Sequence, residues 1–226
     1  MASAQSLKLV LFDLDHTLLS GDSDVLWCDF LIQKRVLQGD SFTARNADME
    51  TRYKAGTVGL EEFANFYVGT LAGRTPQDWE PLRYEFLKDW IAPRIPKAAT
   101  DLVRRDLDAG KLVVLTTATN RFITELTARH LHIEHLIATE PQLQNGVFTG
   151  RTLGTLNMRE GKVTRLLAWL GARQQQLKDF DSSAYSDSIN DLPLLQAVNH
   201  AVAVDPDARL KSEALARGWQ ILRLAR

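Results

Sequence analysis

The feature that most constrains this chain is a short apolar run, Leu9 to Phe12, which ends in two aspartates one residue apart, Asp13 and Asp15. A run without polar alternation predicts a strand buried on both faces, as in a parallel sheet covered by helices. Open α/β sheets bind ligands at the carboxyl ends of their strands. On an extended backbone the two carboxylates would share a face, where like charges are unfavourable unless a cation lies between them or one holds a proton. The pair is therefore either a turn cap or half of a metal and catalytic site.

After residue 96 the pattern alternates between strand and helix. Buried apolar runs and amphipathic stretches follow one another, and a glycine-flanked segment at 146–150 indicates a hairpin arm. Such alternation predicts an α/β fold with a doubly wound parallel sheet, whose strands end at one edge. The expected strands are 112–116, 135–139, 180–186, 200–204 and 218–222, and the expected helices are 97–109, 121–130, 161–170, 192–197 and 207–217.

Between the first strand and this alternating region the chain shows helical periodicity and no strong strand pattern. Pro93 and Pro96 predict an extended linker where the pattern changes. We therefore expect an α/β core domain formed by residues 1–20 and 92–226, and an all-helical cap formed by residues 21–91. A lobe inserted at a strand end is suited to act as a lid. Its expected helices are 25–37, 42–53, 60–71 and 78–90.

Composition excludes several classes of protein. The 226 residues suffice for one core with a subsidiary lobe, and a net charge of −1 gives no reason to expect a nucleic acid or an anionic membrane as partner. The single cysteine, Cys28, excludes an internal disulfide framework and fits a reducing compartment. Met1–Ser6 lack the basic and apolar parts of a secretory signal, and no apolar run approaches ~18 residues. We therefore expect a cytoplasmic protein.

Three further stretches place chemically useful side chains at strand ends or helix starts. The run Val113–Asn120 ends an expected strand in hydroxyls, Glu160–Val163 opens a helix with a lysine, and Tyr185–Asp191 ends another strand in two carboxylates four residues apart. Because parallel strands end at one edge of the sheet, these groups are expected to meet. The converging set is Asp13, Asp15, Thr117, Lys162 and Asp187.

This set has a definite chemical meaning. Carboxylates together with carbonyl oxygens make a hard, oxygen-rich site of the kind that suits Mg²⁺. A lysine and a hydroxyl near the backbone N–H groups of a helix start suit a phosphoryl group. One aspartate beside the metal stays ionised and can attack phosphorus, while a second can give and take a proton if its pKa is raised.

The same segments, in this order, resemble the four motifs of the haloacid dehalogenase superfamily of phosphohydrolases. The resemblance is greatest to the branch with a helical cap after the first strand, the phosphoserine phosphatase-like subfamily IB. It covers about residues 7–20 and 96–226, and Phe12–Leu18 corresponds to the first motif of the family. Glycines are common in the last motif of the family where this chain has Ser186 and Ser188, so the loop there is expected to differ locally.

The resemblance implies a role for each matching residue. Asp13 would be the nucleophile that forms an aspartyl-phosphate, and Asp15 would protonate the leaving oxygen and then activate water. Lys162 would neutralise charge on the phosphoryl group and on Asp13. Thr117 and Ala118 would bind the phosphate.

The resemblance also implies a metal site. Asp187 would complete a Mg²⁺ site with the Asp13 carboxylate and the Asp15 backbone carbonyl. Asn190 and Asp191 would support the metal-bound waters and the surrounding loop. Asn190 would also lie at the phosphate-binding site.

Some assignments stay open. Asp22 matches an acidic residue that contacts the substrate amine in phosphoserine phosphatases, but it suits a helix N-cap equally well. Thr116 or Thr119, rather than Thr117, could supply the phosphate-binding hydroxyl. His16 is beside the site, but its side chain is expected to point away from the face shared by the aspartates.

The sequence thus predicts a Mg²⁺-dependent phosphomonoesterase whose partner is a small phosphorylated metabolite, phosphoserine-like or histidinol-phosphate-like. Two other classes of function remain open: a phosphotransferase to an alcohol acceptor, and a non-catalytic regulatory domain that binds a phosphorylated ligand. Retention of both Asp13 and Asp15 argues against the regulatory domain. The oligomeric state and the physiological substrate are not predicted.

Overall fold

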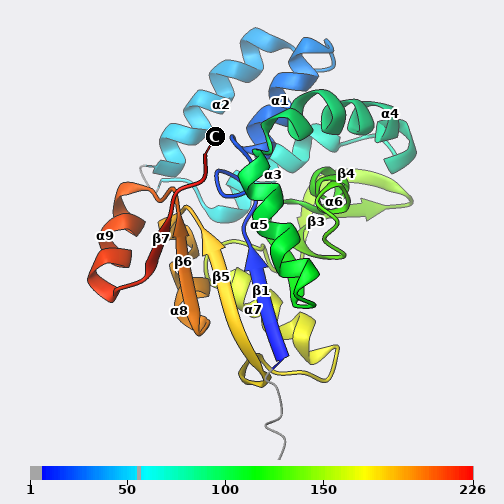
Figure 1. Ribbon diagram of the computed structural model, residues 1–226. Helices are drawn as coiled ribbons and strands as arrows, with labels where there is room; N and C mark the ends of the chain where they lie inside the picture. The colour runs from blue at the N-terminus through cyan, green and yellow to red at the C-terminus, as the bar shows by residue number, and fades with distance from the viewer. Residues whose placement is uncertain (1–6, 55–56, 226) are drawn as a thin grey trace, which may run out of the picture.

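A seven-stranded sheet forms the centre of the protein, with strand order β4-β3-β2-β1-β5-β6-β7. The computed structural model describes residues 7–54 and 57–225, so the expectation for Met1–Ser6 lies outside the described residues. All neighbouring strands are parallel except β3 and β4, which form an antiparallel hairpin (Figure 1). The strands are β1 (Leu7–Phe12), β2 (Leu112–Asn120), β3 (His135–Gln144), β4 (Val147–Leu153), β5 (Phe180–Ser186), β6 (His200–Val204) and β7 (Gln220–Leu222).

Helices cover both faces of this sheet, and β1 shows why. Its alternate side chains divide between two apolar clusters, with Val10 and Phe12 in one and Leu9 and Leu11 in the other. The first cluster includes residues of α5 and α6, and the second includes residues of α7, α8 and α9. The predicted doubly wound α/β fold is therefore confirmed. These helices are α5 (Lys97–Asp108), α6 (Arg121–His130), α7 (Glu160–Gly171), α8 (Leu192–Ala197) and α9 (Ala208–Arg217).

The segment between β1 and α5 is helical in the described residues, as expected, and Figure 1 shows its helices gathered beyond one end of the sheet. Pro76 starts α4 after Thr75, whose hydroxyl caps the helix, as proline in a first helical turn allows. The helices are α1 (Ser23–Gln33), α2 (Gly39–Lys54), α3 (Leu60–Val68) and α4 (Pro76–Phe86).

The prediction of an extended linker before α5 is wrong. A π-helical turn (Leu87–Ile91) and a 3₁₀ turn (Ala92–Arg94) continue the chain from α4. Pro93 fits there because the first turn of a helix needs no N–H donor from it. Only Ile95 and Pro96, with extended backbones, separate these turns from α5.

Two strands are longer than predicted. β2 continues to Asn120 and β3 to Gln144. The prediction ended each strand close to the end of its apolar run, but the more polar residues that follow also belong to the strand. The expected hairpin arm is β4, and it is joined to β3 by Asn145 and Gly146, both at positive φ. Such a pair is typical of a two-residue hairpin turn.

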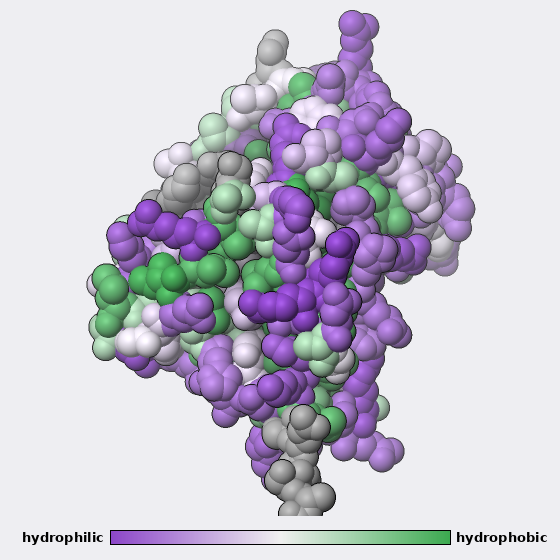
Figure 2. All heavy atoms as spheres, in the orientation of Figure 1, coloured by the Kyte–Doolittle hydropathy of each residue, from purple (hydrophilic) through white to green (hydrophobic). Residues whose placement is uncertain are grey.

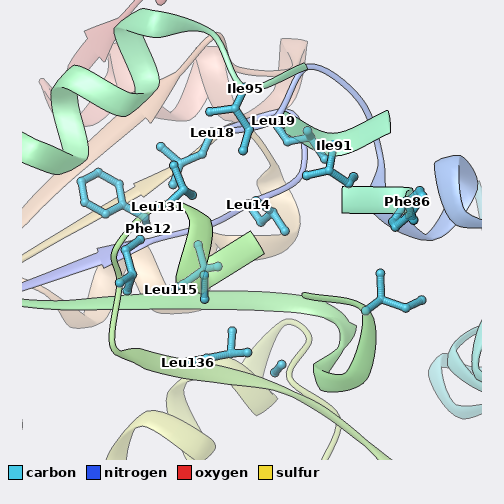
Figure 3. Close-up of a cluster of buried hydrophobic side chains, with 14 of the residues drawn as sticks. Phe12, Leu14, Leu18, Leu19, Phe86, Ile91, Ile95, Leu115, Leu131 and Leu136 are labelled. Carbon is cyan, nitrogen blue, oxygen red and sulfur yellow. The ribbon is translucent and has the colours of Figure 1, made fainter. Parts of the chain in front are cut away.

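One apolar cluster joins the inserted helices to the sheet. Figure 3 shows Phe86 and Ile91 of the inserted segment in the same cluster as Phe12 and Leu115 of the central strands. The cluster also contains Trp27, which is fully buried. The division into an α/β core domain and a cap of residues 21–91 remains a prediction. The apolar cluster extends across the proposed boundary between them.

The surface is mixed in character. On the face of the molecule that Figure 2 draws, most side chains are polar, and apolar side chains gather near α9 and β7. Within the described ranges, no helix is both long enough and apolar enough to cross a bilayer.

Candidate active site

A cavity of about 190 Å³ lies where β1, β2 and β5 end and where α1 and α7 begin. Side chains of α3, Phe63 and Tyr67, form part of its wall. The cavity brings together almost all of the residues singled out from the sequence, namely Asp13, Asp15, Asp22, Ala118, Lys162, Asp187, Asn190 and Asp191.

Lys162 is the centre of an ion-pair network within this cavity. Its ammonium is buried and donates to Asp13 Oδ1 at 2.7 Å and to Asp191 Oδ2 at 2.6 Å. Burial alone lowers the pKa of Lys162, but the charges of both carboxylates outweigh it and raise that pKa above its usual value. Lys162 is therefore a fixed positive charge beside Asp13.

The start of α7 places this lysine. Gly161, just before it, packs so closely that a Cβ there would lie 2.0 Å from the Leu156 carbonyl oxygen. No side chain larger than hydrogen fits at that distance. The residue before α7, Arg159, has a φ of 49° and a ψ of −124°, which is unusual for a residue with a side chain. The close turn before α7 therefore fixes where Lys162 enters the cavity.

Asp13 follows β1 directly and is held by the sheet itself. Its N–H donates to the Tyr185 carbonyl of β5 at 3.0 Å, which continues the strand pairing by one residue. Burial raises its pKa to about 7; Lys162 opposes that rise, and Asp191 and Asp15 add to it. The side chain is thus a buried carboxylate at the sheet edge whose protonation depends on the charges around it.

Asp187 faces the same point from the end of β5. The hydroxyl of Thr17 lies 3.0 Å from Asp13 Oδ2 and 3.1 Å from Asp187 Oδ1, so one small group separates the two carboxylates. Burial and the charge of Asp13 raise the pKa of Asp187 to about 8. Two carboxylates this close, one of which raises the pKa of the other, are suited to share a cation.

The donor set fits Mg²⁺. Among the described residues, no three His, Cys, Asp or Glu side chains are arranged to hold a metal ion by themselves. Mg²⁺ in proteins is usually held by one or two carboxylates, with the remaining positions taken by other oxygens and water. Asp13 and Asp187 supply such a pair.

Asp15 is held apart from Asp13 by its own hydrogen bonds. Asp15 Oδ1 accepts from the Ser23 N–H at 2.7 Å, and Thr119 Oγ1 lies 3.0 Å from Asp15 Oδ2. Burial and the charge of Asp22 raise its pKa to about 6. A carboxyl group with this pKa can exchange a proton near neutrality.

His16 is among the residues that line the cavity, and the expected direction of its side chain stays a prediction. The expectation assumed that the extended backbone continues beyond β1. Instead β1 ends at Phe12, and His16 has a φ of 56°, so strand alternation does not apply to it.

The N-cap interpretation of Asp22 is confirmed, and its contact with a substrate amine stays a prediction. Its Oδ1 accepts from the N–H groups of Asp24 and Val25, which makes it the N-cap of α1, and the residue also lines the cavity. Asp24 lines the cavity as well and was not predicted. Its place in the segment Asp22-Ser23-Asp24 at the expected start of a helix was a signal, but such residues are also common as caps.

The three candidate threonines have different surroundings. Thr119 lines the cavity, whereas Thr117 is buried beneath it, with its Oγ1 3.4 Å from Asp15 Oδ2. Thr116 accepts a hydrogen bond from Asn157, a buried residue that sequence reasoning missed. The Asn157 side chain also donates to two backbone carbonyls, and so secures the loop before α7.

Comparisons with known proteins agree with this geometry. The family model for haloacid dehalogenase-like hydrolases matches residues 10–196. A protein of Neisseria meningitidis serogroup C named histidinol-phosphatase is 35% identical over 217 residues, which cover 95% of this chain and 98% of that protein.

Solved structures show the same fold. A Bordetella pertussis protein of unknown function has a TM-score of 0.92 at 45% identity, covering 96% of this chain and 99% of its own. A substrate-bound phosphoserine phosphatase has a TM-score of 0.68 at 16% identity, covering 96% and 93% of the two chains. The family model and the Neisseria relative both extend over most of this sequence, so the chain belongs to the family of haloacid dehalogenase-like hydrolases.

Proposed function

We propose that this protein is a Mg²⁺-dependent phosphomonoesterase that hydrolyses a small phosphorylated metabolite through an aspartyl-phosphate. The observation that carries the proposal is the buried contact of Lys162 with Asp13, with Asp15 held separately in the same cavity. A carboxylate beside a fixed positive charge, with a second carboxyl group able to exchange a proton, matches the needs of a two-step phosphoryl transfer.

In this proposal the Asp13 carboxylate attacks phosphorus and displaces the alcohol. Asp15 gives its proton to the leaving oxygen, and its raised pKa supports that role. It then takes a proton from the water that attacks the aspartyl-phosphate. Lys162 stabilises negative charge on the phosphoryl group. The backbone at Ala118 binds a phosphate oxygen together with a threonine hydroxyl, either that of Thr117 below the cavity or that of Thr119 on its wall.

The metal would be held by the carboxylates of Asp13 and Asp187 and by the backbone carbonyl of Asp15. When bound, Mg²⁺ supplies positive charge that stabilises the transferring phosphoryl group. Asn190 and Asp191 support this side of the cavity; Asp191 does so by accepting hydrogen bonds from Lys162 and Ser186.

The partner would be a small molecule in the cytoplasm. The name of the Neisseria relative favours a histidinol-phosphate-like ester, and the resemblance found in the sequence also includes phosphoserine. Asp22 lines the cavity and could contact the amine that both esters carry.

Release of phosphate from an aryl phosphate tests the proposal. Asp13→Asn removes the nucleophile and is expected to lower kcat at least about a thousandfold, and an excess of EDTA should abolish activity in the unaltered protein. Asp108→Asn, at an exposed aspartate of α5, is the matched control and should retain activity. Full activity of Asp13→Asn or of the EDTA-treated protein would show that the assigned roles are wrong.

A further inference from the structure

We propose that a second cavity, beside the active site, binds the phosphate ion that hydrolysis releases. This inference rests on the proposed phosphatase function and adds a route by which that product leaves the protein. Two arginines of this second cavity, Arg159 and Arg209, hold the ion after it leaves Asp13 and before it reaches solvent.

The second cavity has a volume of about 340 Å³ and adjoins the active site. Arg159 and Asn190 line both cavities, so the two share a wall. The other walls of the second cavity come from the start of α7, the short turn at Ile189–Asp191 and the first turns of α8 and α9. A phosphate ion that leaves the active site past the shared wall therefore enters the second cavity directly.

The two arginines both lie at the start of a helix, where a positive side chain is unfavourable. Arg159 is the N-cap residue of α7, and Arg209 is the second residue of α9. The N-terminal end of a helix is the positive end of its dipole, so a cation there adds to the positive charge. An anion bound between the two side chains offsets this charge.

Arg209 is available for such a ligand. Its side chain is exposed, and its guanidinium forms no hydrogen bond or ion pair with the part of the chain that the structure describes. The neighbouring carboxylate of Asp207 instead accepts hydrogen bonds from three backbone N–H groups, including that of Ile189. Among the described residues that line the second cavity, Glu160 is the one carboxylate. Guanidinium groups bind phosphate oxygens through paired hydrogen bonds.

The charges of the active site favour departure of phosphate toward the second cavity. The two cations in the wall of the active site, Arg159 and Lys162, both come from the start of α7, which is the side that the cavities share. A phosphate dianion is attracted to this side and repelled by the aspartates elsewhere in the wall.

Isothermal titration calorimetry with potassium phosphate tests the second site. The titrations contain EDTA, because the metal-free active site presents mainly carboxylates to the ion, and they are run at constant ionic strength. We expect one phosphate to bind per chain. Arg209→Gln should weaken binding about tenfold, and Glu160→Gln, which removes the opposing charge, should strengthen it. Lys211→Gln, at an exposed lysine of α9 outside the cavity, is the matched control and should leave binding unchanged.

Hydrolysis of an aryl phosphate in the presence of Mg²⁺ tests the role of the site in release. Phosphate that binds only at the active site competes with the ester and leaves kcat unchanged. Phosphate that also fills the second cavity blocks the exit of the next ion, so we expect kcat to fall as phosphate is added. In Arg209→Gln the same fall should require about tenfold more phosphate.

The outcomes separate the two proposals. Absence of phosphate binding in EDTA, or equal binding by Arg209→Gln and Lys211→Gln, would overturn the second site, while hydrolysis of the aryl phosphate would leave the phosphatase function intact. A kcat that does not change with added phosphate would overturn the role of the site in release. Failure to hydrolyse the aryl phosphate would overturn the phosphatase function, and the release route with it.

Discussion

At the scale of single residues, the site is a set of charges that hold one another in place. Lys162 forms ion pairs with both Asp13 and Asp191, while the Thr17 hydroxyl lies between Asp13 and Asp187. Burial raises the pKa of Asp13 and of Asp187, so their ionised forms are costly in the metal-free protein. The arrangement is therefore less stable than an apolar core of the same size, and a bound cation would stabilise it.

The metal-free protein is expected to lose stability as the pH rises. The folded pKa values of Asp13, about 7, and Asp187, about 8, lie above the ordinary value of 3.8, so the folded state binds protons that the unfolded chain has released. This contribution is complete below about pH 4 and is lost as the pH rises through 7 and 8. In EDTA, Tm measured by circular dichroism should fall between pH 5 and pH 9. Asp187→Asn should flatten that dependence, and an equal slope in both proteins would contradict the argument.

Replacing Lys162 by methionine should destabilise the fold as well as abolish activity. The change leaves Asp13 and Asp191 buried without their shared counter-ion, which typically costs about 3–5 kcal/mol. Urea unfolding at pH 8 measures this loss in the free energy of unfolding. Lys178→Met, at an exposed lysine, is the control and should change the free energy of unfolding by less than about 0.5 kcal/mol. Equal midpoints for the two variants would refute the role of the pair.

The sequence predicted the residues at strand ends more readily than those held by distant contacts. Asp13 follows an apolar run and Asp187 follows a segment with a strand pattern, so parallel-sheet geometry was enough to bring them together. Asn157 follows no such run, and its importance comes from hydrogen bonds to β2 and β3. Asp24 was missed because its position at a helix start has an ordinary explanation as well as a functional one.

At the scale of elements, the site depends on how each helix and strand begins or ends. The strands β5 and β6 have the predicted bounds. Neighbouring residues in the sequence were enough to show where each of these strands begins and ends. The segment before α5 was mispredicted because Pro93 is compatible with both an extended linker and the first turn of a helix. Packing of Ile91 into the shared apolar cluster favours the helical form.

Gly161 offers a test of this dependence. In Gly161→Ala the added Cβ clashes with the Leu156 backbone, so the start of α7 must shift and move Lys162. We expect a loss of about 1–3 kcal/mol in stability and at least a tenfold loss in kcat. Gly171→Ala, at the other end of α7, meets nothing within 4 Å and is the matched control. Comparable activity in the two variants would show that the close turn does not position the lysine.

At the scale of the whole molecule, the inserted helices and the sheet share one apolar cluster. Trp27 and Phe86 pack against each other with a ring-centroid distance of 5.1 Å, in the cluster that includes Leu115. The buried Arg83 of α4 also pairs with Glu125 of α6 at 2.8 Å. Sequence periodicity predicted the helical insertion, but this shared packing involves distant residues and was not predicted.

Because of this shared cluster, the protein should unfold in a single transition. Phe86→Ala removes a buried ring of the inserted segment and should lower the stability of the whole chain by about 3–5 kcal/mol. Tryptophan fluorescence, far-ultraviolet circular dichroism and residual phosphatase activity should lose their native signals at the same temperature. Two separate transitions would indicate that the inserted segment and the sheet are independent units.

The hydrogen bond from the Ser23 N–H to Asp15 joins the first residue of α1 to a side chain in the loop that follows β1. Because α1 also packs into the shared apolar cluster through Trp27, the packing of this helix sets where the Ser23 N–H lies. The orientation of the Asp15 carboxyl group therefore depends on side chains buried well away from the cavity.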